Sequence, residues 1–212
     1  MGLEITAFVN GKWRQNCYLV RDTEGNTIII DPGSQPQEIE ALVEQNGLRV
    51  HAVLNTHAHY DHIGAVAALQ DRYAVPFYLH AADENLLKRA NLYRMMFESR
   101  DPVRVPKITQ DIASLPGDFT VGPFQVSWIA TPGHTEGSIC FLMNGCLFSG
   151  DTLMHDAIGR TDLPGANREM LLASVRKLMD LPPETVVYGG HGPKTTIGAE
   201  FAEGARVWSF LQ

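Results

Sequence analysis

The stretch THAHYDH, from Thr56 to His62, places three histidines and one aspartate within six residues. Histidine is partly polar, is costly to bury without hydrogen-bond partners and contributes little to packing. A cluster this dense therefore indicates a site at which side chains hold something other than one another. Its candidate ligands are His57, His59, Asp61 and His62.

Three more ligand-type residues follow predicted strands in the second half of the chain. His134 comes after the strand ending in IATPG, Asp151 ends CLFSGD, and His191 ends TVVYGGH. The histidine cluster itself follows the predicted buried strand VHAVLNT. Because strand ends at one rim of a sheet can bring distant parts of a chain together, we expect these four segments to meet.

Seven imidazole and carboxylate groups exceed the four ligands of one tetrahedral zinc. They suit two divalent ions a few ångströms apart with a bridging carboxylate. Nitrogen and oxygen ligands without thiolate are compatible with Zn²⁺, Fe²⁺ or Mn²⁺. Of these three ions, we expect Zn²⁺. A lone histidine would be interpreted as a core or surface residue, but five histidines and two aspartates at four strand ends are not.

Predicted strands and helices alternate along the chain. Turn signals at Asn10-Gly11, at 24–26 and at Asn144-Gly145 separate short β-rich runs and predict hairpins. This order fits two sheets with helices on their outer faces, although periodicity alone does not distinguish such a sandwich from a doubly wound sheet. Helices are predicted at 35–48, 63–73, 81–98 and 167–181.

Charge and composition limit the classes of binding partner and the compartment that we expect. Lys plus Arg is 17 and Asp plus Glu is 24, which gives a net charge of −7, and no long basic run occurs. We therefore expect no nucleic-acid partner, and no apolar run is long enough for a membrane span. Three cysteines without CxxC spacing favour a reduced, cytoplasmic compartment. The sequence specifies no oligomeric state.

The HxHxDH motif at 57–62, followed by single His, Asp and His residues after later strands, resembles the metallo-β-lactamase superfamily. The resemblance implies one α/β domain over 1–212, an αββα sandwich of two mixed sheets with the metals in a groove at one edge. It also implies that Asp31, in IIIDPG, orients ligating histidines, although a turn-forming role before Pro32 is an alternative. The implied ligands are His57, His59 and His134 for the first metal, Asp61, His62 and His191 for the second, and Asp151 as the bridge.

Within the superfamily, GDTL, IGRTDLPGA and YGGHGPKTTIGAE resemble the glyoxalase II group, most closely its short bacterial branch, which lacks the helical C-terminal substrate domain. The implied reaction is hydrolysis of S-D-lactoylglutathione, a step in methylglyoxal detoxification, by attack of a metal-bridging hydroxide. Asp61 would orient the hydroxide and accept a proton. A thioester suits such a site because its thiol, with a pKa of roughly 8 to 9, leaves as thiolate without a strong general acid.

Three residues are candidate contacts for this small-molecule thioester. Arg160 is either a carboxylate anchor or part of a structural salt bridge. Tyr60 either lines the pocket or packs on the following helix, and His155 lies close to the expected groove. The alternatives to the hydrolase are a persulfide dioxygenase with a single iron, another thioesterase or lactonase of the same fold, and a non-catalytic metal-binding module.

Overall fold

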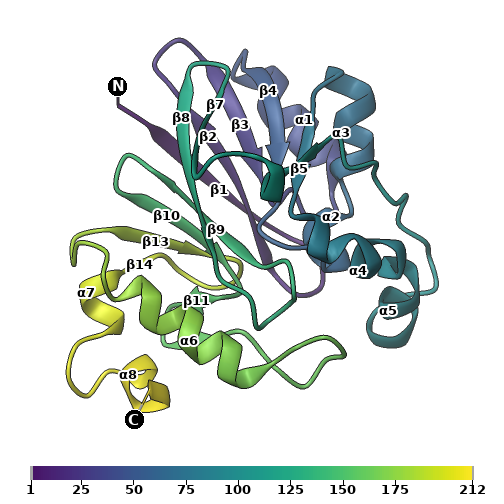
Figure 1. Cartoon of the computed structure of the whole chain (residues 1–212). Coiled ribbons are helices and arrows are strands. Elements are labelled where there is room, and N and C mark those ends of the chain that lie inside the picture. Colours follow the sequence, from purple (N-terminus) through teal and green to yellow (C-terminus); the bar gives the residue numbers. More distant parts are fainter. Residues whose placement is uncertain (1, 212) are drawn as a thin grey trace.

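The computed structural model describes residues 2–211, which form two six-stranded mixed sheets packed face to face. Helices cover the outer face of each sheet, with α1 and α3 on one side and α6 and α8 on the other (Figure 1). This confirms the predicted αββα sandwich. No helix in residues 2–211 has the length and apolar character needed to cross a membrane.

The first sheet begins with two hairpins and continues in parallel strands. Its order follows the chain, with antiparallel pairing up to β3 and parallel pairing from β3 to β6. The residues of β3 are all buried, as expected for a strand covered on both faces. The strands are β1 (Glu4–Asn10), β2 (Gln15–Arg21), β3 (Asn26–Ile30), β4 (Arg49–Leu54), β5 (Phe77–Leu79) and β6 (Gln110–Asp111).

The second sheet has the order β14-β13-β10-β9-β8-β7, and only β10 and β13 are parallel among its pairs. Asn144 and Gly145 have φ of 47° and 73°, the left-handed conformation that a tight hairpin turn requires, so this predicted hairpin is confirmed. Its strands are β7 (Asp118–Val121), β8 (Phe124–Ala130), β9 (Ile139–Met143), β10 (Cys146–Gly150), β13 (Val186–Gly189) and β14 (Thr195–Thr196), and a separate small hairpin joins β11 (Leu153–Met154) to β12 (Ala157–Ile158).

Three layers of buried side chains hold the sandwich together. Ile30 and Leu54 of the first sheet meet Phe141 and Phe148 of the second between the sheets. Separate clusters pack helices onto each outer face, and full burial of one large apolar side chain contributes about 1.5–3 kcal/mol. The helices are α1 (Pro36–Gln45), α2 (Tyr60–Ile63), α3 (Val66–Tyr73), α4 (Glu84–Lys88), α5 (Ala90–Phe97), α6 (Arg168–Leu178), α7 (Ile197–Glu200) and α8 (Arg206–Leu211), with 3₁₀ turns η1 (Ala81–Asp83) and η2 (Ile112–Ser114).

The single helix predicted over 81–98 is wrong. The segment divides into η1, α4 and α5, and the chain changes direction at Arg89, whose φ and ψ are −97° and 5°. His80 follows β5 and caps η1, because its Nδ1 accepts the backbone N–H of Ala82 at 3.2 Å. The helix predicted over 63–73 is present as α3, which begins at Val66, while Ile63 ends the short helix α2.

Candidate metal centre

The seven predicted ligands meet at one edge of the sandwich, where four strands end. The THAHYDH segment runs from the end of β4 into α2, and the loops after β8, β10 and β13 bring the remaining ligands. Ligand atoms of the first group lie within 4.8 Å of one another, and so do those of the second. The first group is His57, His59 and His134, and the second is Asp61, His62 and His191. These are the two ligand sets expected from the resemblance, and metal binding by them stays a prediction.

Asp151 lies between the two groups. Its Oδ2 is 3.4 Å from Nε2 of His134 and 3.7 Å from Nε2 of His191. Its Oδ1 is 3.6 Å from Nε2 of His62. One carboxylate thus faces members of both groups, the position that a bridging ligand requires.

Asp31 orients one histidine of each group, His57 and His62, through hydrogen bonds on the side of the rings away from the centre. Its carboxylate accepts the backbone N–H of Thr56 at 2.8 Å, the Thr56 hydroxyl at 2.7 Å and Nδ1–H of His62 at 3.1 Å. The Thr56 oxygen lies in turn 3.0 Å from Nδ1 of His57. With Nδ1 of both imidazoles engaged, each presents Nε2 to the centre, as expected of ligands held by an outer carboxylate.

Backbone carbonyls orient two other histidines. Nδ1 of His134 lies 2.9 Å from the carbonyl oxygen of Arg160, and Nδ1 of His191 lies 2.9 Å from that of Trp13. Both rings therefore also present Nε2. His59 presents Nδ1, which is 2.9 Å from Nε2 of His134.

The electrostatics of the cluster favour neutral imidazoles at His57 and His59, a protonated imidazole at His62 and an ionised carboxylate at Asp151. Burial, reinforced by neighbouring histidines, lowers the pKa of His57 and His59 well below the usual value. Burial alone would lower the pKa of His62, but Asp61, Asp31 and Asp151 together raise it to about 9. Burial alone would raise the pKa of Asp151, and the surrounding histidines instead lower it to about 2.

Three buried atoms test whether these residues fit metal ions. Nε2 of His57, Nε2 of His62 and Oδ1 of Asp151 have no hydrogen-bond partner. A buried polar group left without a partner costs about 1–3 kcal/mol, so folded proteins rarely keep several together. Divalent ions between the two groups would satisfy all three atoms. The donor set therefore fits a binuclear site, as the resemblance in sequence implies.

Gly190 contributes to the centre through its lack of a side chain. A Cβ there would lie 2.1 Å from Oδ1 of Asp151 and 2.8 Å from Cε1 of His62. The backbone before His191 can therefore approach the bridging carboxylate only as glycine. Sequence reasoning did not single out Gly190, although the pair of glycines immediately before His191 was a usable signal.

Asp83 is a second residue that sequence reasoning missed. Its buried carboxylate accepts the backbone N–H of Ala58 at 2.9 Å, the Thr135 hydroxyl at 2.9 Å and the backbone N–H of Gly137 at 2.7 Å. Ala58 lies between two ligands of the first group, and Thr135 directly follows the third. Asp83 thus fixes the two loops that carry that group, although burial raises its pKa.

A cavity of about 110 Å³ opens beside the two groups. Tyr60 and Arg160, both predicted substrate contacts, line it, and so does Trp13. Nε1–H of Trp13 donates to the Tyr60 hydroxyl at 2.7 Å and fixes that ring. Arg160 is bound in two places by Asp162, with both N–O distances 2.7 Å. It also lines the cavity, so its role as a carboxylate anchor stays a prediction.

The structure places His155 away from this cavity. It lies in the turn between β11 and β12, where its Nδ1 is 3.1 Å from Oε1 of the buried Glu200 in α7. The expectation of a substrate contact is corrected on this ground, because the small hairpin directs His155 toward α7 rather than the metal groups.

Comparisons with known proteins agree with this geometry. The family model described as the metallo-beta-lactamase superfamily matches residues 10–191. A relative from Bacillus subtilis, "Probable metallo-hydrolase YqgX", is 36% identical over 202 residues, which cover 89% of this chain and 94% of the relative. "Hydroxyacylglutathione hydrolase GloC" of Haemophilus influenzae is 33% identical over 209 residues, which cover 93% of this chain and 92% of the relative.

Two solved structures share the fold at comparable sequence identity. BLEG-1, a B3 metallo-beta-lactamase, superposes with a TM-score of 0.88 at 35% identity, covering 93% of this chain and 96% of that one. TTHA1623, solved in a di-iron-bound form, superposes with a TM-score of 0.81 at 39% identity, covering 93% of this chain and 97% of that one.

Proposed function

The chain belongs to the metallo-β-lactamase superfamily of metal-dependent hydrolases, and from that premise we propose that it hydrolyses glutathione thioesters, with S-D-lactoylglutathione as substrate. The observation that carries the proposal is the pair of complete ligand groups joined by Asp151 beside a cavity. A persulfide dioxygenase with a single iron would need only one of these groups. Two complete groups therefore favour the hydrolase.

The first group, the second group and Asp151 would hold two divalent ions, with zinc expected and iron as the alternative for the same nitrogen and oxygen donors. Two such ions supply an activated water nucleophile and stabilise the negative charge that develops on the substrate carbonyl oxygen. Asp61 lies at the cavity wall, with Oδ2 3.6 Å from Nε2 of His191. In the proposed reaction Asp61 orients the attacking water and accepts its proton.

The residues of the cavity favour a leaving group that departs without a proton. Burial, with the nearby charge of Asp61, raises the pKa of Tyr60 to about 12, so its hydroxyl is a weak acid at neutral pH. Arg160 is paired with Asp162, and the lining histidines belong to the two metal groups. A thiolate leaves readily under these conditions, whereas the amine of an amide requires protonation. A thioester therefore suits this cavity, because its thiolate leaves without a proton.

The choice of glutathione as the thiol carrier is supported by the GloC relative, whose name is that of a hydroxyacylglutathione hydrolase. In the proposed reaction, water adds to the thioester carbonyl carbon and the C–S bond breaks. D-lactate and glutathione are the products.

The test is hydrolysis of S-D-lactoylglutathione by the purified protein, with metal content measured on the same sample. We expect turnover to rise with metal content up to two ions per chain, and Asp61→Asn to lower kcat by about 10²–10⁴-fold. Asp71→Asn is the matched control, because Asp71 is an exposed carboxylate paired with Arg104. It is expected to retain wild-type turnover.

Three results would contradict the proposal. Fully metallated protein that hydrolyses no glutathione thioester would exclude this substrate. Hydrolysis of a β-lactam in its place would indicate a lactamase. Oxygen consumption with glutathione persulfide by the iron-loaded protein would indicate a dioxygenase.

A further inference from the structure

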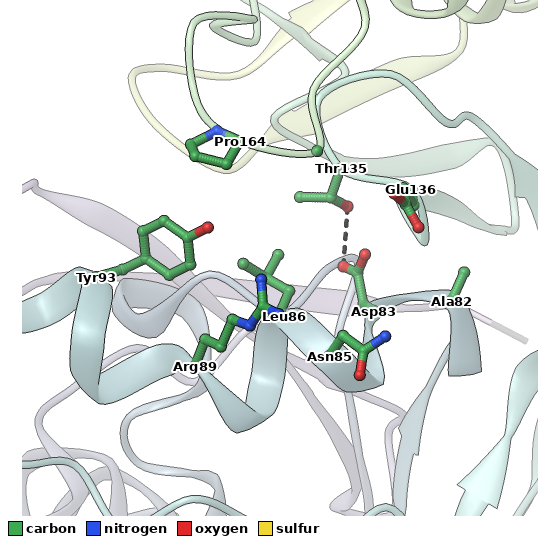
Figure 2. Close-up of a pocket in the computed structure, with 10 residues that line it drawn as sticks. Ala82, Asp83, Asn85, Leu86, Arg89, Tyr93, Thr135, Glu136 and Pro164 are labelled. Carbon is green, nitrogen blue, oxygen red and sulfur yellow. Dashed lines mark hydrogen bonds between the residues drawn. The ribbon is translucent and has the colours of Figure 1, made fainter.

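A second cavity, of about 250 Å³, adjoins the metal cavity. Tyr93 lines both, Thr135 in the second cavity follows His134 in the first, and Pro164 likewise follows Leu163. Figure 2 shows two walls, one from the helical segment with Asn85, Arg89 and Tyr93, the other from loops with Thr135, Glu136 and Pro164. A substrate reacting at the metals can therefore extend past Tyr93 into this second space.

Three polar side chains of this cavity are unpaired within the described part of the chain. Asn85, Arg89 and Glu136 line the cavity as exposed residues, and their side chains form no hydrogen bond or ion pair with residues 2–211. Nearby charges outside the cavity differ in this respect, since Lys88 is paired with Glu84 at 2.9 Å. The cavity thus presents one cation, one anion and one amide that are available to a ligand.

The placement of these charges selects the kind of ligand. Arg89 belongs to the helical wall and Glu136 to the opposite loop (Figure 2). A simple anion would be attracted by Arg89 and repelled by Glu136, and a simple cation would meet the reverse. A zwitterion satisfies both, with its carboxylate at Arg89 and its ammonium at Glu136. The Asn85 amide can hydrogen-bond either end.

We propose that this cavity binds the α-amino-acid end of the thiol carrier, the part of the substrate that bears both an ammonium and a carboxylate. The inference rests on the proposed function and specifies how the protein recognises the thiol carrier of the substrate. Glutathione carries such an end on its γ-glutamyl residue. Arg160, one of whose two expected roles was to anchor a carboxylate, is paired with Asp162, whereas the side chain of Arg89 has no ion-pair partner in residues 2–211.

The experiment compares two S-D-lactoyl thioesters, one of glutathione and one of N-acetylcysteamine, which lacks both charges. The readout is the ratio of kcat/KM for the first substrate to that for the second. Arg89→Gln and Glu136→Gln are each expected to lower this ratio about tenfold, mainly through KM of the glutathione thioester. Lys88→Gln and Glu84→Gln, both in α4 and outside the cavity lining, are the charge-matched controls and keep the wild-type ratio.

A ratio that is unchanged in Arg89→Gln and Glu136→Gln would overturn the inference while leaving the proposed function intact. If no thioester is hydrolysed, the proposed function fails, and calorimetric binding of S-methylglutathione to the metal-loaded protein decides the inference separately. Binding weakened about tenfold by Arg89→Gln but not by Lys88→Gln would support it. Equal affinity in both variants, or no binding to the wild type, would overturn it.

Discussion

Asp31 shows how much one residue can organise at this centre. Its φ of 48° lies in the left-handed region, which residues other than glycine adopt rarely and aspartate more readily than most. This conformation turns the carboxylate back onto Thr56 and His62, which it hydrogen-bonds. The backbone strain is thus located where it sets the direction of two metal-facing imidazoles.

Gly190 acts at the same scale by leaving space, and this can be tested. In Gly190→Ala the new methyl would collide with Oδ1 of Asp151, so the bridging carboxylate must move. We expect the affinity for zinc to fall by at least about tenfold, as measured by competition with a chelating dye. Gly117→Ala is the control, since a Cβ there meets nothing within 4 Å. Equal zinc affinity in both variants would refute a steric role for Gly190.

At the scale of elements, local sequence predicted the strands well and the helix after β5 poorly. Turn residues marked the hairpins, and buried β-rich runs marked β3 and β4. Nothing between residues 84 and 97 breaks a helical pattern, because the segment contains neither proline nor glycine. The separation of η1 from α4 accompanies contacts distant in sequence, those of Asp83 with Ala58 and Gly137. Such contacts leave no local signal.

Replacement of Asp83 tests whether its hydrogen bonds attach η1 to the two loops that carry the first ligand group. In Asp83→Asn one acceptor oxygen becomes an NH₂ group, which would face a donor at Ala58, Thr135 or Gly137. We expect the free energy of unfolding to fall by about 1–3 kcal/mol, as measured by urea denaturation of the metal-free protein. Asp71→Asn, at an exposed carboxylate, should change it by less than about 0.5 kcal/mol. A wild-type stability in Asp83→Asn would show that the three hydrogen bonds do not fix these loops.

At the scale of the whole molecule, the centre joins the two sheets. His57, His59 and His62 follow β4 of the first sheet, whereas His134, Asp151 and His191 follow strands of the second. The sequence could predict this convergence because each ligand stands just after a β-rich run. It could not predict the role of Trp13, whose contacts with Tyr60 and His191 cross 47 and 178 positions of the chain.

Because each metal group draws ligands from both sheets, metal removal should destabilise the entire sandwich. Bound metal at 100 times its Kd stabilises a fold by about 2.7 kcal/mol. For a chain of this size that corresponds to a decrease in Tm of about 5–10 °C on chelation, restored by zinc and measured by calorimetry. Nε2 of His57 and Nε2 of His62 add to the effect, since neither has a hydrogen-bond partner without metal.

Two histidine variants separate this effect from general damage by the chelator. His62→Ala removes a ligand and should reduce the difference in Tm between metal-loaded and chelated protein. His155→Ala removes a histidine that is bound to Glu200 outside the centre, and should preserve that difference. If chelation left the Tm of the wild type unchanged, or if His155→Ala abolished the difference, the two sheets would not be joined through metal at this site.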